Sequence, residues 1–295
     1  MANFTLDSTI KDELNNRLEN LEKYFKADVI FYYGEIHPSY VKFFRDFIEK
    51  LIEEEKSGRS TPDTLVILLN APGGSAETVE KMVEIVRFHY KNVYFVVPDF
   101  AMSAGTIFCM SGDKIFMDYS SALGPIDPQV HNGKEYVPAM GYLDKVEEML
   151  KKAKEGSITK AEFLILQSLD LATLSRYEQA KNLTITLLKN WLVEYKFKDW
   201  DKHQSDPIKK GKPVTAEEKK ERAEKIAELL GDNKKWHSHG RLIGIKTLTE
   251  ELKLKIEDYS KNNELRNLIR SYNDLIVDYI VKNGFKVFVH SRNFI

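Results

Sequence analysis

Short runs of consecutive apolar residues alternate with stretches of helical period over residues 8–117. The runs 65–69 (LVILL) and 93–97 (VYFVV) are almost wholly apolar and end at turn residues, which is typical of parallel strands buried on both faces. Between such runs, apolar residues recur every three or four positions, as on one face of a helix. The predicted series is helix 8–25, strand 28–36, helix 39–56, strand 65–69, helix 75–90, strand 93–97, helix 103–110 and strand 114–117. This alternation predicts an α/β fold whose parallel strands are joined by right-handed crossovers.

Beyond residue 143 the pattern becomes mainly helical and charged. Residues 143–198 predict helices, and the polar stretch 199–214 predicts a loop because it has no period. Thr215 and Glu218 form a capping-box pattern that opens a helix ending near Gly231. The remaining elements are an irregular stretch at 236–245, a charged helical tail at 247–282 expected to be an exposed or subunit-contacting face, and a terminal strand at 285–289. We therefore predict an N-terminal helix (1–27), a core (28–198), a polar loop (199–214) and a helical C-terminal region with a terminal strand, packing on the core or on a partner subunit (215–295).

Composition and charge narrow the classes of function. The chain of 295 residues is 42% apolar and 30% charged, with a formal net charge of −1. This balance favours neither a nucleic acid nor an anionic membrane as partner. The single cysteine, Cys109, excludes an intramolecular disulfide, and its apolar neighbours predict a buried side chain. Because the N-terminus lacks the pattern of a secretory signal and no window reaches the roughly 18 apolar residues of a membrane span, we expect a soluble, cytoplasmic protein.

A glycine pair follows the second predicted strand. Pro72, Gly73 and Gly74 join strand 65–69 to the next helix, at whose N-terminus backbone N–H groups attract negative charge. Glycine permits a positive φ and lets a ligand approach the backbone closely. The pair lacks the length and the lysine of a nucleotide-phosphate loop. It is either a tight strand–helix turn or a pocket for an oxyanion.

A serine surrounded by small residues follows the next strand. Ser103 has Ala101, Ala104 and Gly105 as near neighbours. Taken alone, it is most simply a helix N-cap, a position that serine favours. Yet the serine and the glycines both follow parallel strands, and open α/β sheets place their active clefts at the carboxyl ends of such strands. Together they predict a nucleophile beside backbone N–H donors for an oxyanion.

Several segments carry a resemblance to a known family. They are Leu69–Ser75 (LNAPGGS), Ala101–Thr106 (AMSAGT), Gly112–Ile115 (GDKI), Leu123–Gln129 (LGPIDPQ) and Trp236–Arg241 (WHSHGR). From about residue 25 to residue 245 the chain resembles the serine dehydrogenase proteinase family of the Clp/crotonase superfamily, relatives of signal-peptide peptidase A and of the Clp proteolytic subunit. The resemblance implies stacked ββα units, a serine nucleophile, an oxyanion hole and oligomeric assembly. The pattern along the chain adds a parallel sheet and a helical C-terminal extension.

The resemblance also assigns roles by position. Ser103 matches the nucleophile of the family. The implied oxyanion hole is formed by Gly73, Gly74 and the Ala104 N–H, and the implied wall of the substrate groove includes Leu123, Gly124 and Pro125.

The sequence leaves several candidates for the general base. The Clp proteolytic subunit has a histidine in the segment where this chain has Gly124-Pro125-Ile126, whereas signal-peptide peptidase A uses a lysine further along. Lys145 is the lysine at a comparable separation, although a solvated helix face is the simpler interpretation of it. His239 is the second candidate because a neutral histidine is a usual partner for serine. Further options are His131, Lys134 and Asp170.

The leading hypothesis is a serine peptidase that cleaves a peptide or protein substrate through an acyl-enzyme on Ser103. It needs no cofactor and no metal, and it is expected to form a homo-oligomer; nothing in the sequence indicates membrane association. The alternative is a catalytically inactive Clp-like protein that binds peptides or acts as a scaffold, which the missing histidine motivates. Acyl-coenzyme A chemistry is a third hypothesis, although the crotonases that perform it do not need a nucleophilic serine.

Overall fold

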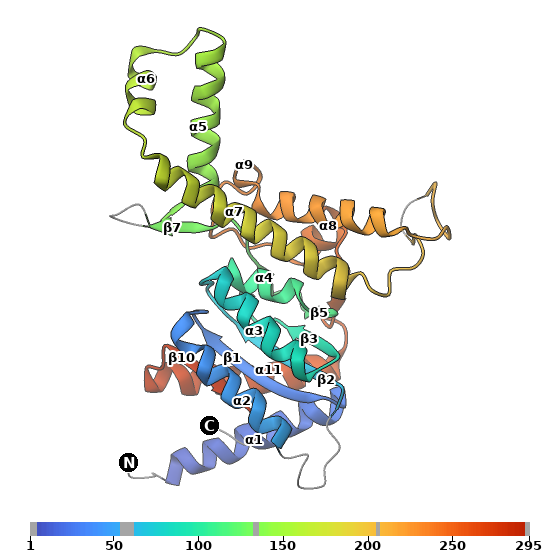
Figure 1. Ribbon diagram of the computed structural model, residues 1–295. Helices are drawn as coiled ribbons and strands as arrows, with labels where there is room; N and C mark the ends of the chain where they lie inside the picture. The colour runs from blue at the N-terminus through green and yellow to red at the C-terminus, as the bar shows by residue number, and fades with distance from the viewer. Residues whose placement is uncertain (1–4, 54–61, 132–135, 205–206, 293–295) are drawn as a thin grey trace.

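A six-stranded sheet forms the centre of the molecule (Figure 1). The computed structural model describes residues 5–53, 62–131, 136–204 and 207–292. The sheet has the order β10-β1-β2-β3-β5-β9. Its strands run parallel except for β10, which pairs antiparallel with β1 at one edge. The strands are β1 (Asp28–Gly34), β2 (Thr64–Asn70), β3 (Asn92–Val96), β4 (Phe100–Ala101), β5 (Lys114–Met117), β6 (Ala122–Leu123), β7 (Gln129–His131), β8 (Tyr136–Pro138), β9 (Glu257–Asp258) and β10 (Val287–His290).

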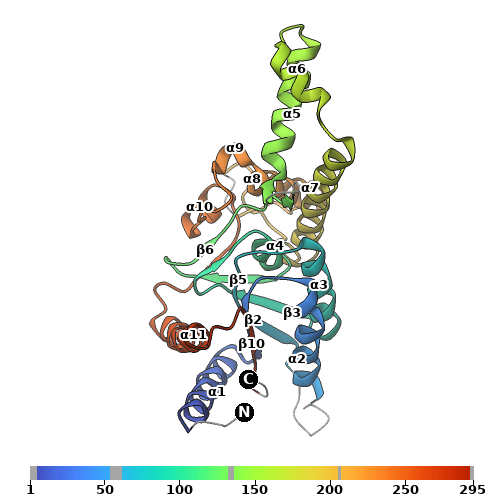
Figure 2. The same ribbon diagram turned by 90° about the vertical axis from the view of Figure 1, so that its left-hand side faces the viewer.

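Helices cover both faces of this sheet (Figure 2). The helices are α1 (Thr5–Phe25), η1 (Pro38–Tyr40), α2 (Val41–Glu53), α3 (Ala76–His89), α4 (Ala104–Met110), α5 (Ala139–Lys154), α6 (Lys160–Gln167), α7 (Leu171–Trp191), the π-helical turn η3 (Leu192–Lys196), α8 (Ala216–Gly231), α9 (Asn233–Trp236), α10 (Ile245–Glu250) and α11 (Asn263–Asn283). Alternate residues of β2 point to opposite faces. Leu65 and Ile67 therefore join the core formed with α2, α3 and α4, whereas Val66 and Leu68 join the core formed with α1 and α11.

The doubly covered sheet confirms the α/β prediction and explains its apolar runs. The four predicted strands of the first 120 residues are β1, β2, β3 and β5, and they pair in parallel as expected. Ser75 caps α3 by accepting a hydrogen bond from the Thr78 N–H, and Thr215 with Glu218 forms the predicted capping box at α8. Since a strand between two helical layers has no solvent face, consecutive residues are all apolar.

The C-terminal region differs from the single charged helix expected at 247–282. It contains α10, the two-residue strand β9 and α11 in succession. One face of α11 is buried against the sheet, and its opposite, charged face is exposed. The buried residues of α11 are Leu265, Ile269, Tyr272, Asn273, Ile276, Tyr279 and Ile280.

Two helices project from the body as an arm (Figures 1 and 2). The base of α5 follows the β7–β8 hairpin, and α6 returns toward α7. None of the residues of α6 is buried. Three consecutive apolar side chains, Phe163, Leu164 and Ile165, are 48–56% exposed.

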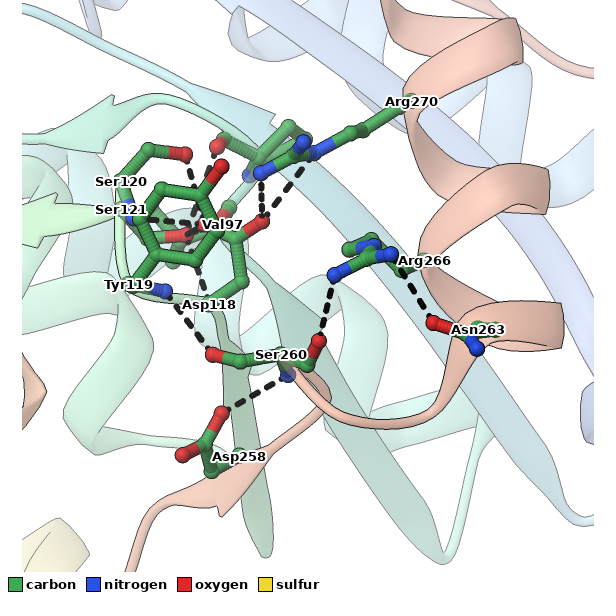
Figure 3. A network of polar contacts seen from close by, with 11 residues as sticks. Val97, Asp118, Tyr119, Ser120, Ser121, Asp258, Ser260, Asn263, Arg266 and Arg270 are labelled. Atoms are coloured by element: carbon green, nitrogen blue, oxygen red, sulfur yellow. Dashed lines mark hydrogen bonds and ion pairs between the residues drawn. The ribbon is translucent and has the colours of Figure 1, made fainter.

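A polar network fastens α11 to the carboxyl end of β5 (Figure 3). The Arg270 guanidinium donates hydrogen bonds to Asp118 Oδ2 at 2.6 and 3.2 Å, and Asp118 Oδ1 accepts hydrogen bonds from Ser120. Nearby, the Tyr119 N–H donates to Ser260 Oγ at 3.0 Å. Burial alone would raise the pKa of Asp118, but the hydrogen bonds from Ser120 and the pairing with Arg270 outweigh it and lower that pKa.

Arg270→Ala is expected to lower the free energy of unfolding by about 2 kcal/mol, because it leaves the buried Asp118 carboxylate without its cation. A carboxyl with a lowered pKa in the folded state stabilises the fold above its unfolded pKa, and this contribution is lost as the pH falls through the folded value. Urea unfolding over a series from pH 7 down to about pH 2 measures both effects. The matched control is Arg45→Ala, whose partner Asp46 is 42% exposed, so this substitution is expected to leave the free energy of unfolding nearly unchanged. Equal losses for the two variants would contradict the assigned role of Arg270.

Candidate active site

The glycine loop and the serine loop lie side by side at the carboxyl end of the sheet. Beyond β2, Ala71 pairs in parallel with Ala101 of β4. The Ala71 N–H donates to the Phe100 carbonyl at 3.1 Å, and the Met102 N–H donates to the Ala71 carbonyl at 2.9 Å. Two hydrogen bonds between backbones thus bring the residues before Gly73 against the residues before Ser103.

Ser103 has a strained backbone at the start of α4. Its φ is 51° and its ψ is −115°, a region that residues other than glycine rarely occupy and that costs about 1–3 kcal/mol. It holds the N-cap position, yet its side chain accepts no capping hydrogen bond, so the simpler interpretation as a helix cap does not hold. The residue is half-buried, while Ala104 and Gly105 beside it are buried. Strain without a capping role is typical of a residue held in place for function.

Gly73 lies directly against this serine. A β-carbon placed on Gly73 would lie 3.1 Å from Ser103 Cβ and 3.7 Å from Ser103 Oγ, and its φ of 129° also requires glycine. At Gly74 a β-carbon would meet the Ile36 carbonyl oxygen at only 2.0 Å. Ile36, just beyond β1, clamps the loop by donating its N–H to the Gly73 carbonyl and accepting the Ser75 N–H. The sequence pattern did not point to Ile36, because its role depends on pairing with a loop some 37 residues away.

Three backbone N–H groups remain available around Ser103. Within the described residues, the N–H groups of Gly73, Gly74 and Ala104 donate to no acceptor. The Ala104 N–H is free because the first turn of a helix has no intrahelical acceptors for its N–H groups. The bridge between Ile36 and Gly74 uses the Gly73 carbonyl and the Ser75 N–H, so it leaves the Gly74 N–H unpaired among the described residues. Such donors stabilise negative charge on a ligand oxygen.

The segment 123–129 forms the opposite wall of the serine loop. Leu123 of β6 pairs with Ala101 on one side and, through both its backbone groups, with Ile243 on the other. Gly124 donates its N–H to Thr106 Oγ1. Leu123, Gly124 and Pro125 are all buried beside the serine loop.

Asp127, within the same segment, has a buried carboxyl group. Burial raises its pKa to about 6, and a hydrogen bond from the Met140 N–H opposes this shift. Its Oδ1 accepts that hydrogen bond at 3.0 Å, whereas its Oδ2 has no partner among the described residues. Asp127 therefore ties the segment behind Ser103 to the first turn of α5.

His239 is neutral, as a general base must be. It is half-buried, its Nδ1 is buried without a hydrogen-bond partner among the described residues, and burial lowers its pKa, so it is neutral at pH 7. It lies four residues before Ile243, whose pairing with Leu123 places this segment on the same small sheet as β4. Among the described residues, the Ser103 hydroxyl forms no hydrogen bond with His239 or with any other side chain.

Lys145 lies on α5 in a different environment. Its side chain is 70% exposed, and its ammonium forms an ion pair with Glu148 at 2.7 Å. Asp170 is the exposed N-cap of α7 and accepts hydrogen bonds from the N–H groups of Ala172 and Thr173. This capping role explains why an acidic residue stands there. The side chain of His131 and the whole of Lys134 lie outside the described residues.

Cys109 is fully buried in α4, as predicted. The described part of the chain holds no cluster of His, Cys, Asp and Glu with the geometry of a metal site. Its helices include none with the length and apolar character needed to cross a membrane.

Comparison with known proteins identifies the family of this chain. Residues 46–227 match the family model described as ClpP-like SDH-type serine proteinase. The uncharacterized protein MJ0137 of Methanocaldococcus jannaschii is 29% identical over 160 residues, which are 52% of this chain and 50% of that protein. A second protein of that organism, MJ1495, is 32% identical over 85 residues, which are 28% of this chain and 29% of its own length. The chain thus spans about half the length, or less, of the curated relatives that it matches.

Two solved structures are more distant. Both are mutants of the 1510-N membrane-bound stomatin-specific protease. One has 13% identity and a TM-score of 0.43, covering 81% of this chain and 83% of that chain. The other, in complex with a substrate peptide, has 16% identity and a TM-score of 0.34, covering 57% and 60%. Because the family model matches more than half of this sequence, the chain belongs to the ClpP-like SDH-type serine proteinase family.

Proposed function

We propose that this protein is a serine peptidase in which Ser103 attacks the carbonyl carbon of a peptide bond. The observation that carries the proposal is the strained, half-buried Ser103, held against Gly73 without a capping role. In the first step the Ser103 Oγ bonds to the carbonyl carbon and its proton passes to a base. The base then protonates the leaving amine as the peptide bond breaks. Water hydrolyses the resulting acyl-enzyme in the same two stages and releases the acid product.

The unpaired N–H groups of Gly73, Gly74 and Ala104 are the proposed oxyanion hole. Each donor aimed at the developing oxyanion is worth about 3 kcal/mol of activation free energy. The segment of Leu123, Gly124 and Pro125, which is buried beside the serine loop, is the proposed wall of the substrate groove. The substrate is a peptide or a protein, and the proposed chemistry uses no cofactor.

His239 is the base that this conformation favours, since it is neutral and partly shielded. Lys145 would first have to leave Glu148 and lose its proton in a drier environment, for example on assembly or substrate binding. We propose His239 as the base and retain Lys145 as the alternative.

The pH dependence of kcat/KM and two substitutions distinguish these bases. With His239 as base, kcat/KM is expected to be constant around pH 7 and to fall only at more acidic pH, because burial lowers the pKa of His239. His239→Ala should then reduce kcat about 10²- to 10⁴-fold, and Lys145→Ala should have little effect. A value of kcat/KM that rises steadily above pH 7, together with an inactive Lys145→Ala variant, would transfer the role to Lys145.

Hydrolysis itself is tested by incubating the protein with a defined peptide mixture and following the products by mass spectrometry. The proposal expects cleavage products that disappear after treatment with a fluorophosphonate. Tight peptide binding without cleavage or labelling would favour the second candidate, a peptide-binding or scaffold protein. That candidate is motivated by the Ser103 hydroxyl, which has no base within hydrogen-bond distance in the described part of the chain. Homo-oligomeric assembly stays a prediction, and the exposed apolar residues of α6 are a surface that it could use.

A further inference from the structure

Thr106 joins three backbone segments through one hydroxyl group. It lies on α4, three residues after Ser103, and is fully buried. Its Oγ1 donates to the Ala101 carbonyl at 2.7 Å and accepts the Gly124 N–H at 2.9 Å. The Gly124 carbonyl, also 2.9 Å away, is a second acceptor for the same proton. A single hydroxyl therefore satisfies a buried donor just after β6 and a buried acceptor at the end of β4.

These segments are the ones that determine the position of Ser103. Ala101 ends β4 two residues before the serine, and Gly124 directly follows β6. The pairing of Ala101 with Leu123 is the last of the β4–β6 ladder. Beyond it the strands are joined by the Thr106 hydroxyl instead of by direct backbone hydrogen bonds, at the point where the chain turns into Ser103.

Close packing leaves this connection little freedom. A β-carbon on Gly124 would lie 2.5 Å from Met102 Cε and 3.2 Å from Met102 Cα. A β-carbon on Gly105 would lie 3.3 Å from the β-carbons of both Ala71 and Ala101. The first turn of α4 therefore sits tightly against the strand before it. A strained residue such as Ser103 keeps its conformation only when its surroundings hold it there.

We propose that Thr106 is a positioning residue for Ser103: its hydroxyl joins Ala101 to Gly124 and so holds the serine loop in the strained conformation that aims Oγ at the substrate. This inference rests on the proposed function, because it concerns the reactivity of the same serine. Thr106 itself touches no reacting atom. Its loss should slow the chemical step and leave peptide binding largely unchanged, since a small misplacement of a nucleophile lowers the rate constant and not the affinity.

The test compares wild type with Thr106→Val, which keeps the shape and removes the hydroxyl. The readouts are the rate constant of labelling by a fluorophosphonate probe and the separate values of kcat and KM for a cleaved peptide. Thr106→Val is expected to lower the labelling rate constant and kcat about 10²-fold with KM changed less than about threefold. Thr106→Ser, which restores the hydroxyl, should return both rates to within about threefold of wild type. Thr184→Val, at a buried threonine of α7, is the control and should label at the wild-type rate.

Each outcome bears on one of the two proposals. If wild type is not labelled at Ser103, the proposed function fails. If wild type is labelled and a folded Thr106→Val variant reacts equally fast, the positioning role of Thr106 is overturned while the peptidase assignment stands. If circular dichroism shows that Thr106→Val is unfolded, the test uses Thr106→Ser and Thr106→Cys instead. The weakly hydrogen-bonding Cys variant must then react much more slowly than the Ser variant, and equal rates would overturn the inference.

Discussion

Replacing Ser103 with alanine is expected to reduce kcat for peptide hydrolysis about 10⁴- to 10⁶-fold and to abolish fluorophosphonate labelling. The nucleophile and its base act as a unit, so removing the nucleophile leaves only the small rate enhancement due to binding and the oxyanion hole. The variant should fold, because the Ser103 hydroxyl forms no hydrogen bond that the described structure needs. Steady-state hydrolysis and labelling of the purified variant measure the effect.

Two further serine variants separate chemistry from folding. Ser168→Ala removes an exposed hydroxyl at the end of α6 and should leave labelling unchanged. Ser103→Gly should be as inactive as Ser103→Ala, yet its free energy of unfolding should exceed that of wild type by about 1 kcal/mol, because glycine accepts the positive φ without strain. A destabilised Ser103→Gly variant would contradict the interpretation that this backbone stores strain for function.

Replacing Gly73 with alanine is expected to reduce kcat about 10²- to 10³-fold. The new β-carbon would lie 3.1 Å from Ser103 Cβ at a backbone with a φ of 129°, so the loop must shift and carry its N–H away from the oxyanion. The same strain should lower the free energy of unfolding by about 1–3 kcal/mol. Kinetics and urea unfolding of one protein preparation give both quantities.

Gly156→Ala is the matched control for this substitution. Gly156 also has a positive φ, 71°, but no atom lies within 4 Å of the site of a new β-carbon. It should therefore lose about 1 kcal/mol of stability and retain wild-type kcat. If Gly73→Ala retains full activity despite its strain, Gly73 has no part in the oxyanion hole.

The central strands and the two loops of the site were predictable because their signals are local. Runs such as 65–69 and 93–97 are apolar at consecutive positions, a pattern that only a doubly covered strand requires. Gly73 stands out because glycine is needed for a positive φ and for close approach of Ser103. The small neighbours of Ser103 are explained in the same way, since a β-carbon on Gly105 would lie only 3.3 Å from the β-carbons of Ala71 and Ala101.

Pairings between distant segments were not predictable. The strand β9 consists of Glu257 and Asp258, whose charge argues against a strand, and it forms because Phe116 and Met117 of β5 offer an unpaired edge. The spacing along the chain also does not predict the pairing of Ile243 with Leu123, or the hydrogen bonds by which Thr106 joins the ends of β4 and β6. The identity of the base was equally unpredictable, because it depends on where Lys145 and His239 lie in space, 42 and 136 positions after Ser103.

The central claim, that Ser103 is an activated nucleophile, is tested most directly by locating the adduct that a fluorophosphonate forms with the wild-type protein. Trypsin releases Ser103 in the peptide 92–114, which also contains Ser111, so fragmentation of that peptide must assign the modified residue. The proposed function predicts one adduct per chain, on Ser103, that a competing peptide substrate suppresses. An adduct on another residue, or a wild-type protein that remains unmodified at high probe concentration, would contradict the claim.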